Sequence, residues 1–119
     1  MRLKKPSEYN EQCALWQWVK TSKTIYPYFF HIPNEHQDEK ERGRLSQTGL
    51  RKGIPDNFIA LPRGKYHGMF IELKCRGGQP TEDQKKWIET LVSQGYYVVL
   101  AYGWVDAVKR IGMYLKEEV

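Results

Sequence analysis

The sequence predicts an α/β domain with a central mixed sheet of about four strands and helices packed on its faces. Along the 119 residues, segments with apolar side chains at helical spacing alternate with short runs of aromatic and β-branched residues, which favour strands. The expected order is helix, three strands, helix, strand, helix. Neither a repeat nor a linker interrupts this order, so we expect one domain over residues 1–119.

The N-terminal third should supply the first helix and the first strand. Ser7 is a good helix cap because its hydroxyl can accept a hydrogen bond from a backbone N–H, and we expect the helix over residues 7–20. Three apolar residues at helical spacing should face the core: Leu15, Trp16 and Val19. Residues 25–33 are rich in aromatic side chains, and the first strand is expected within them, bracketed by Pro27 and Pro33.

The middle of the chain begins with a polar segment and continues into two strands. Residues 35–53 are polar and charged, and long segments of this kind are often functional. A short helix is possible within residues 38–48. The two strands are expected over residues 57–61 and 69–75, with a turn between them that contains proline and glycine.

The C-terminal third should contain two helices separated by a strand. Thr81 and Gln84 have the spacing of a capping box, and Gly95 is a natural end for the helix that they begin. The buried stripe of this helix is expected to consist of Trp87, Ile88, Leu91 and Val92. Residues 96–101 are nearly all apolar, which is typical of an interior strand. The last helix is expected over residues 104–116.

Composition limits the classes of function. The net charge of +5 points weakly to a polyanionic partner, although on charge alone a protein with a basic surface is favoured. No long uncharged apolar run is present, so we expect no membrane span. The basic N-terminus continues into polar residues rather than a signal peptide. Cys13 and Cys75 match neither a disulfide framework nor a zinc site, so a reduced, cytoplasmic chain is expected.

The strand over residues 69–75 carries an acid and a base. Side chains alternate between the two faces of a strand, so Glu72 and Lys74 should share one face. Buried charges are costly unless they are paired or bind something. Taken alone, the two residues are explained at least as well by a surface ion pair on an edge strand.

A second acid just before the preceding strand favours a functional role for Glu72 and Lys74 over a surface ion pair. Asp56 ends the segment Gly53-Ile-Pro-Asp, and a hairpin would bring it beside Glu72. A turn aspartate is common, but the combination with Glu72 and Lys74 is far more specific. Two carboxylates suit a hard cation such as Mg²⁺, which can activate water and polarise a phosphate. A neighbouring lysine can orient the water or neutralise developing charge, so phosphodiester hydrolysis is the reaction that these residues favour.

Pro55-Asp56 with Glu72-Leu-Lys74 resembles the PD-(D/E)XK nucleases, and nearly the whole chain resembles the virus-type replication-repair nuclease domain, VRR-NUC. The motifs that carry the resemblance are Glu8 to Gln12, His31 to Asn34, Gly53 to Asp56, Ile71 to Lys74, and Gln84. The resemblance implies a restriction-endonuclease-like core, Mg²⁺ or Mn²⁺ as cofactor, and DNA as substrate, often branched DNA.

The resemblance also implies roles for single residues. Glu8 is the implied acid of the first helix and a third metal ligand beside Asp56 and Glu72. Glu11 is its rival, but Glu8 lies within the helical arc of the apolar residues and Glu11 at its edge. Gln84 is either a residue of the active site or only half of a capping box, or both. Five residues are expected to contact DNA: Asn34, Arg42, Arg44, Arg51 and Lys52.

The expected function is therefore a metal-dependent, structure-selective DNA endonuclease, with a homodimer that resolves four-way Holliday junctions as the leading form. A monomeric flap or nicking nuclease is one alternative. A DNA-binding module that kept the fold and lost activity is another, and a structural protein with a basic surface is a third. The intact set of Asp56, Glu72 and Lys74 favours catalysis over the binding module, and the structural protein would show neither metal binding nor salt-sensitive DNA affinity.

Overall fold

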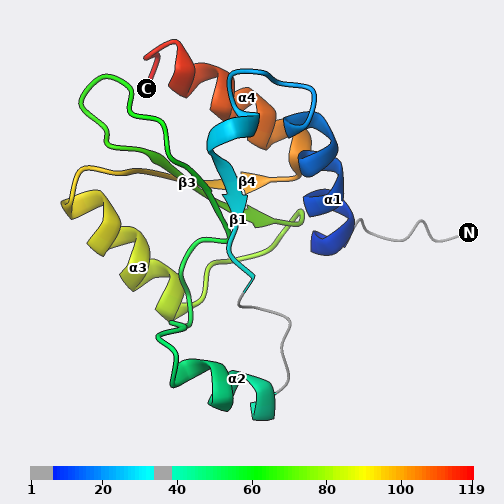
Figure 1. The fold of residues 1–119 in the computed structure, drawn as a ribbon, viewed down its shortest axis with the longest axis vertical. Helices are drawn as coiled ribbons and strands as arrows, with labels where there is room; N and C mark the ends of the chain where they lie inside the picture. The colour runs from blue at the N-terminus through cyan, green and yellow to red at the C-terminus, as the bar shows by residue number, and fades with distance from the viewer. Residues whose placement is uncertain (1–6, 34–38) are drawn as a thin grey trace, which may run out of the picture.

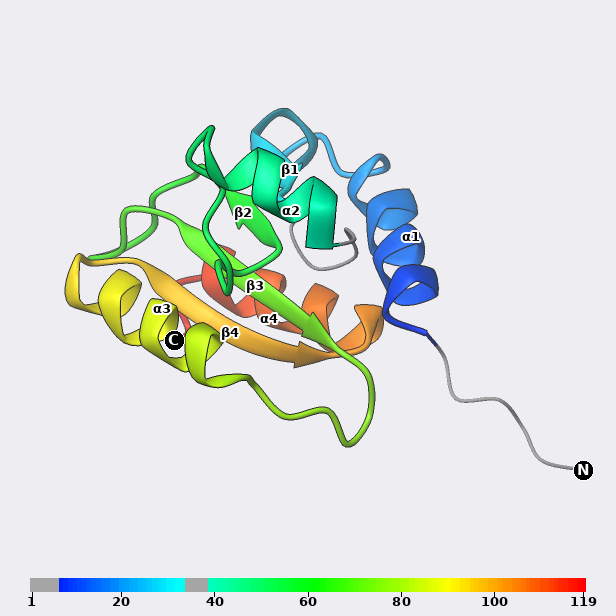
Figure 2. The same cartoon turned by 90° about the horizontal axis from the view of Figure 1, so that it is seen from below.

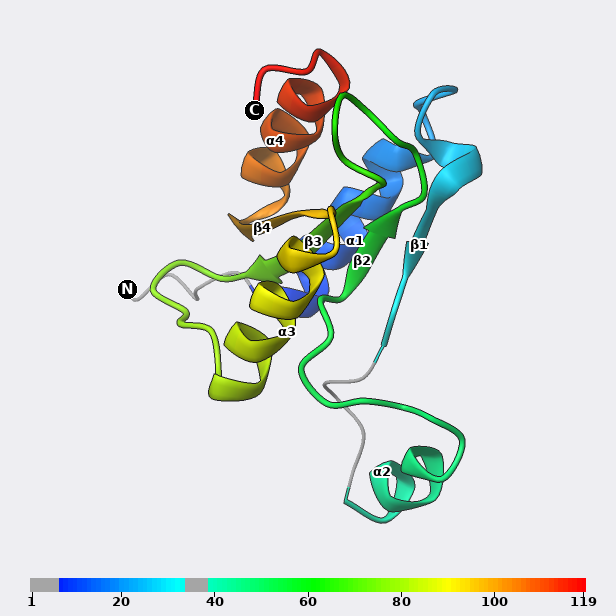
Figure 3. The same cartoon turned by 90° about the vertical axis from the view of Figure 1, so that its left-hand side faces the viewer.

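The structure is a computed structural model that describes residues 7–33 and 39–119. A four-stranded sheet has the order β1-β2-β3-β4, and helices lie on both of its faces (Figure 3). The elements along the chain are α1 (Glu8–Val19), η1 (Tyr26–Tyr28), β1 (Phe29–His31), α2 (Glu39–Ser46), β2 (Asn57–Ile59), β3 (Met69–Lys74), α3 (Glu82–Ser93), β4 (Tyr97–Tyr102) and α4 (Trp104–Leu115). The predicted α/β class and element order are confirmed, and the short helix that was possible within residues 38–48 is α2.

The sheet is mixed. β1 pairs antiparallel with β2, β2 antiparallel with β3, and β3 parallel with β4. The parallel pair requires a crossover, and α3 supplies it. α3 covers one face of the sheet, while α1 and α4 lie together on the other (Figures 1 and 2). α2 stands apart from the sheet. None of the helices in the described ranges is both long and apolar enough to cross a bilayer.

The core lies between the sheet and the pair formed by α1 and α4. The apolar face of β3 points into it through Ile71 and Leu73, which are fully buried. Alternation along the same strand sends Glu72 and Lys74 to the opposite face, toward α3. α4 is anchored by Tyr114, which donates its hydroxyl to the Leu61 carbonyl at 2.7 Å. The predicted division of β3 into an apolar and a charged face is confirmed.

The two predictions about strands have different outcomes. Strand β1 lies between Pro27 and Pro33 as expected and has three residues, with Pro27 accommodated in the 3₁₀ turn η1 that precedes it. Strand β4 is not an interior strand: within the described residues it pairs with β3 alone and forms an edge of the sheet. Its apolar composition comes from helices, since α3 covers one of its faces and α4 the other.

Two predictions about buried helix faces are also corrected. Leu15 and Val19 are buried as expected, but Trp16 is 37% exposed and rests its ring on Tyr26 and Phe29 at the surface. Val92 is exposed near the end of α3 rather than part of its buried stripe. Both residues lie at the margins of their helical arcs, where spacing alone does not separate a buried side chain from an exposed one.

Candidate active site

Two carboxylates meet where β2 begins. Because β2 and β3 pair antiparallel with Asn57 opposite Ile71, Asp56 lies beside Glu72. The Asp56 N–H donates to Glu72 Oε2 at 3.2 Å, and the Leu73 N–H donates to Asp56 Oδ1 at 3.1 Å. Asp56 is 7% exposed and Glu72 is 1% exposed. The structure thus brings together the two acids that the sequence singled out, and it buries both.

Lys74 completes a charged cluster on the same face of β3. Its Nζ lies 3.6 Å from Glu72 Oε1, and both side chains are buried. The desolvation cost of such a pair can exceed its Coulomb gain, so it is weak evidence for a purely stabilising role. Two acids and one lysine in a buried cluster are the kind of arrangement found at functional sites.

Gln84 connects this cluster to the first turn of α3. Its Oε1 accepts from the Thr81 N–H at 2.8 Å, and its own backbone N–H donates to the Thr81 hydroxyl at 3.1 Å, which completes a capping box. Its side-chain amide also donates to Glu72 Oε1 at 2.9 Å. The capping box predicted from the sequence is therefore confirmed, and the same side chain also contacts Glu72.

A buried amide pair on the opposite side of Asp56 was missed by the sequence analysis. Asn57 is fully buried and donates to Asp56 Oδ1 at 3.0 Å. It exchanges hydrogen bonds with the Gln12 amide of α1, at 2.8 Å and 2.9 Å. The sequence does contain a signal for this buried amide. Alternation along β2 places Asn57 on the same face as buried Ile59, where an apolar residue is normal.

The two acids of α1 have different surroundings. Glu11 Oε2 accepts from the Trp104 N–H at 2.9 Å, so Glu11 caps the N-terminus of α4. Glu8 lies one helical turn before Gln12, the residue of α1 that contacts Asn57. Burial raises the pKa of the Cys75 thiol, and the carboxylates of Glu8 and Glu11 add to this rise. Both acids are therefore close to Cys75, the residue that follows β3.

The cluster suits a hard divalent cation. Asp56 and Glu72 offer adjacent carboxylates, and Mg²⁺ is typically held by one or two protein carboxylates together with waters and substrate phosphates. Residues 7–33 and 39–119 contain no group of three or more His, Cys, Asp or Glu placed to hold a metal ion. The expected three-acid set of Asp56, Glu72 and Glu8 is thus not gathered in the described structure, whereas the pair of Asp56 and Glu72 is.

Comparisons with known proteins place this arrangement in a family. The model of the VRR-NUC domain matches residues 4–104. The chain belongs to the VRR-NUC family. A solved structure described as a VRR_NUC domain protein is 32% identical and superposes with a TM-score of 0.85, over 96% of this chain and 92% of that one. The predicted fold class and family are therefore confirmed.

One curated relative of this VRR-NUC chain is a phage protein. It is named "Putative nuclease p44", from Acyrthosiphon pisum secondary endosymbiont phage 1, and is 38% identical over 50 residues. The match covers 42% of this chain and 52% of the phage protein, so it spans about half of that relative.

Four of the residues expected to contact DNA lie in α2 and in the segment that follows it. Asn34 falls outside the described residues, and Arg42 lies within α2. Arg44 is exposed in the last turn of α2. The Arg51 guanidinium lies 5.3 Å from the centre of the Trp87 ring, and Lys52 Nζ lies 3.8 Å from Asp83 Oδ2.

The loop that carries Arg51 and Lys52 packs tightly against α3 in this VRR-NUC chain. Gly53 has a φ of +92°, and a Cβ there would lie 2.7 Å from the Asp83 carbonyl carbon. A side chain at this position would be strained for both reasons. Between this loop and α3 lies a depression of about 440 Å³. Its lining residues are Arg51, Lys52, Asp83, Lys86, Trp87 and Thr90. Gly53 thereby fixes the approach of the chain to Asp56 and sets the two basic side chains beside α3.

Proposed function

We propose that this VRR-NUC chain is a divalent-cation-dependent endonuclease that hydrolyses phosphodiester bonds in DNA. The observation that carries the proposal is the buried pair of Asp56 and Glu72 with Lys74 at 3.6 Å from Glu72. A binding module has no need to bury two acids where a phosphate would approach. Mg²⁺ or Mn²⁺, held by Asp56 and Glu72, would supply Lewis-acid polarisation of the phosphate.

The remaining chemistry is assigned to the chain's own groups. Lys74 is suited to hold the attacking water by its ammonium group and to neutralise charge that develops on the phosphate. Gln84 and the Asp56 N–H fix the two oxygens of Glu72 in place. Asn57 and the Leu73 N–H both donate to Asp56 Oδ1 and hold that oxygen in place. Glu8 is proposed as a third acid that acts through water, since Mg²⁺ keeps several waters.

A cleavage panel tests this proposal. Supercoiled plasmid, linear duplex, flap, fork and four-way junction substrates would be incubated with Mg²⁺, using the native chain and Asp56→Asn as a matched inactive control. Asp56→Asn preserves the size of the side chain and its hydrogen bond to the Leu73 N–H. Cleavage by the native chain alone supports the nuclease. DNA binding without cleavage by either protein would instead support the non-catalytic DNA-binding module.

We further propose that the enzyme is a homodimer that resolves four-way Holliday junctions. One domain holds one cluster of this kind, whereas resolving a junction needs two cuts placed symmetrically, and two-fold dimers are the commonest oligomers. The edge strand β4 offers backbone groups for pairing with a second copy. Exposed Tyr102 and Val105 near its end add apolar surface. The phage relative and a DNA substrate favour the bacterial cytoplasm as the place of action.

The alternative form is a monomer that nicks flaps or duplex ends. Light scattering at micromolar concentration, combined with the junction assay, separates the two. Paired, symmetric nicks in a junction by a particle of twice the chain's mass support the dimer. A monomer that trims flaps and leaves junctions intact would remove the dimer proposal while leaving the nuclease proposal standing.

A further inference from the structure

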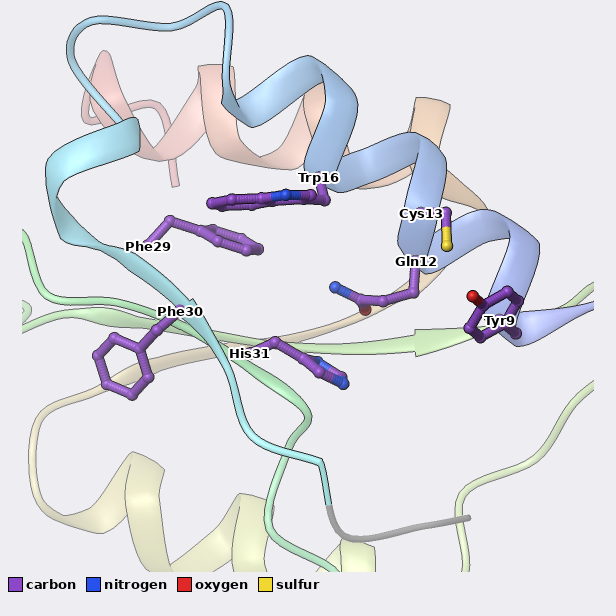
Figure 4. A pocket seen from close by; sticks show the side chains of 7 residues that line it. All are labelled: Tyr9, Gln12, Cys13, Trp16, Phe29, Phe30 and His31. Carbon is purple, nitrogen blue, oxygen red and sulfur yellow. The ribbon is translucent and has the colours of Figure 1, made fainter.

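A pocket of about 450 Å³ lies between α1 and β1. Tyr9, Gln12, Cys13 and Trp16 line it from the helix, and Phe29 and His31 from the strand. Figure 4 shows the Trp16 and Phe29 rings nearly parallel, with Gln12 and His31 between them and Tyr9. The Trp16 and Phe29 ring centres are 6.0 Å apart and their planes differ by 28°. The pocket therefore combines flat aromatic walls with polar groups.

Two aromatic side chains of the pocket are exposed to solvent, and one of them is held by contacts with neighbouring rings. Tyr9 is 70% exposed and Trp16 is 37% exposed, whereas Phe29 is buried beneath them. The Trp16 ring also contacts Tyr26 at 5.8 Å between ring centres, so it is held from two sides. Exposed apolar surface that is gathered around a hollow commonly marks a binding site.

The pocket is linked to the candidate active site by hydrogen bonds through buried Asn57. Gln12 lines the pocket and also exchanges hydrogen bonds with Asn57, which donates to Asp56. His31 is paired with Asn57 across the two strands, and the next residue, Ile32, donates its N–H to the Asp56 carbonyl at 2.7 Å. The wall formed by β1 thus ends at the residue that supplies one of the two carboxylates.

We propose that this pocket receives one unpaired nucleobase of the DNA, next to the phosphate that is cut. The inference rests on the proposed nuclease function and refines its substrate to DNA with an unpaired base at the cut. Every base has a flat π-face that can stack on Trp16, so the recognition is of an unstacked base rather than of a sequence. The bonds to Asn57 use one N–H and one oxygen lone pair of the Gln12 amide, and an amide carries two of each, which suits contact with a base edge.

The main competing occupant is a second copy of the chain. A hollow with an oriented amide at its floor, joined to the carboxylates by two successive hydrogen-bonded contacts, fits a small planar polar ligand better than a flat protein surface. Through the same hydrogen bonds, a base that contacts Gln12 could affect the position of Asp56. If a nucleobase occupies the pocket, removing one particular base should weaken DNA binding through Trp16. If a second copy occupies it, no single base should be coupled to Trp16.

The test is a double-mutant cycle between the protein and the DNA. Forked DNA would be prepared as a series in which each member lacks one base near the branch, and affinity would be measured with Ca²⁺ in place of Mg²⁺. For the native chain, we expect one abasic position to weaken binding by about five- to a hundredfold, the range for base–aromatic stacking. With Trp16→Ala the same abasic position should have no further effect, and Trp16→Phe should restore most of the coupling.

Controls separate the outcomes. Tyr28→Ala removes an exposed aromatic ring from the same segment but outside the pocket, and it should leave the abasic effect unchanged. Additive losses from Trp16→Ala and the abasic site at every position would overturn the inference while leaving the nuclease proposal intact. Conversion of a dimer to a monomer by Trp16→Ala, with no coupling to any base, would assign the pocket to self-association. Failure of the native chain to bind DNA at all would overturn both proposals.

Discussion

Gln84 donates a hydrogen bond to Glu72 Oε1 at 2.9 Å while its own Oε1 accepts from the Thr81 N–H at 2.8 Å. The two partners fix the orientation of the Gln84 amide. The backbone N–H of Thr81 is a donor and must face the amide oxygen, whereas the Glu72 carboxylate is an acceptor and must face the NH₂ group. One side chain therefore begins α3 and orients a buried carboxylate. Gln84 is for this reason a positioning residue, and its oxygen is engaged in the helix cap.

The first prediction separates these two roles of Gln84. Gln84→Glu should keep the capping box, since glutamate serves there as well as glutamine. It removes the donor to Glu72 and places a second carboxylate beside it. We expect cleavage to fall about 10- to 100-fold, the usual cost of removing such a supporting residue at a metal site. A like charge raises the pKa of Glu72, so the remaining activity should shift to higher pH.

Thr81→Ala is the matched control for Gln84→Glu. It removes the other half of the capping box and should cost about 1 kcal/mol of folding stability. Cleavage and its pH profile should stay close to those of the native chain. If Thr81→Ala shifts the pH profile as far as Gln84→Glu does, then Gln84 acts only through the helix.

The second prediction concerns the charged cluster itself. Asp56→Asn, Glu72→Gln and Lys74→Met should each reduce cleavage by about 100-fold or more. Their effects on stability should differ in sign. Asp56→Asn relieves repulsion between two buried carboxylates and should leave the melting temperature equal or higher without metal. Lys74→Met and Glu72→Gln each remove one partner of the buried pair, which costs about 3–5 kcal/mol.

Cleavage rates and thermal melting of the same three proteins check this prediction. A folded Asp56→Asn or Glu72→Gln protein with nearly native turnover would remove the site. A Lys74→Met protein that melts as the native chain does would show that solvent or another group compensates the two carboxylates.

Much of the fold was predictable because it depends on local periodicity. Alternation alone places Glu72 and Lys74 on one face of β3, and the spacing of Thr81 and Gln84 alone predicts the capping box. The position of β4 was not predictable in this way. An apolar run indicates that both faces of a strand are covered. It does not indicate whether the strand has a neighbouring strand on one side or on both.

The candidate site was predictable where its residues follow one another in a motif, and not where they meet across the fold. Asp56, Glu72 and Lys74 fall in two short segments. Asn57 and Gln12 are 45 positions apart, and only the packing of α1 against the sheet pairs them. The cap that Glu11 provides to α4 spans 93 positions and is a long-range interaction of the same kind.

The third prediction compares the two acids of α1. Glu8→Gln should reduce cleavage more than Glu11→Gln, because Glu8 lies one turn before Gln12, which contacts the Asn57 that donates to Asp56. Glu11→Ala should instead lower stability by about 0.5–2 kcal/mol, since it removes an acceptor and a negative charge from the N-terminus of α4. Cleavage assays and chemical denaturation of both variants measure the two effects. The reverse order of cleavage losses would assign the catalytic acid to Glu11.

The fourth prediction concerns the cation. Mg²⁺ and Mn²⁺ should support cleavage, while Ca²⁺ should allow DNA binding with little turnover, because it is larger, looser in geometry and a weaker activator of water. Each of the three ions should also raise the melting temperature, since a ligand that binds only the folded state stabilises it. That rise should disappear in Asp56→Asn. Full activity in excess chelator would exclude a metal from the mechanism.

The last prediction concerns the basic surface beside α3. Arg51 and Lys52 are exposed, and neither lies in the carboxylate cluster, so they are suited to contact phosphates without reading sequence. Each phosphate that a cation neutralises releases counterions, which makes affinity fall with salt. Replacing both residues by alanine should therefore reduce the slope of log affinity against log salt by about 0.9 for each phosphate that is no longer neutralised.

Two comparisons make the salt experiment decisive. Lys109→Ala removes an exposed cation from α4, on the opposite face of the sheet, and should leave the slope unchanged. Arg51→Lys keeps the charge but removes the planar group that lies over Trp87, so it should keep most of the slope while weakening affinity at every salt concentration. An equal reduction of slope in Lys109→Ala and in the double variant would mean that the slope reports net charge alone. An unchanged slope in the double variant would place the DNA on another surface, leaving the carboxylate cluster to be reached from a different side.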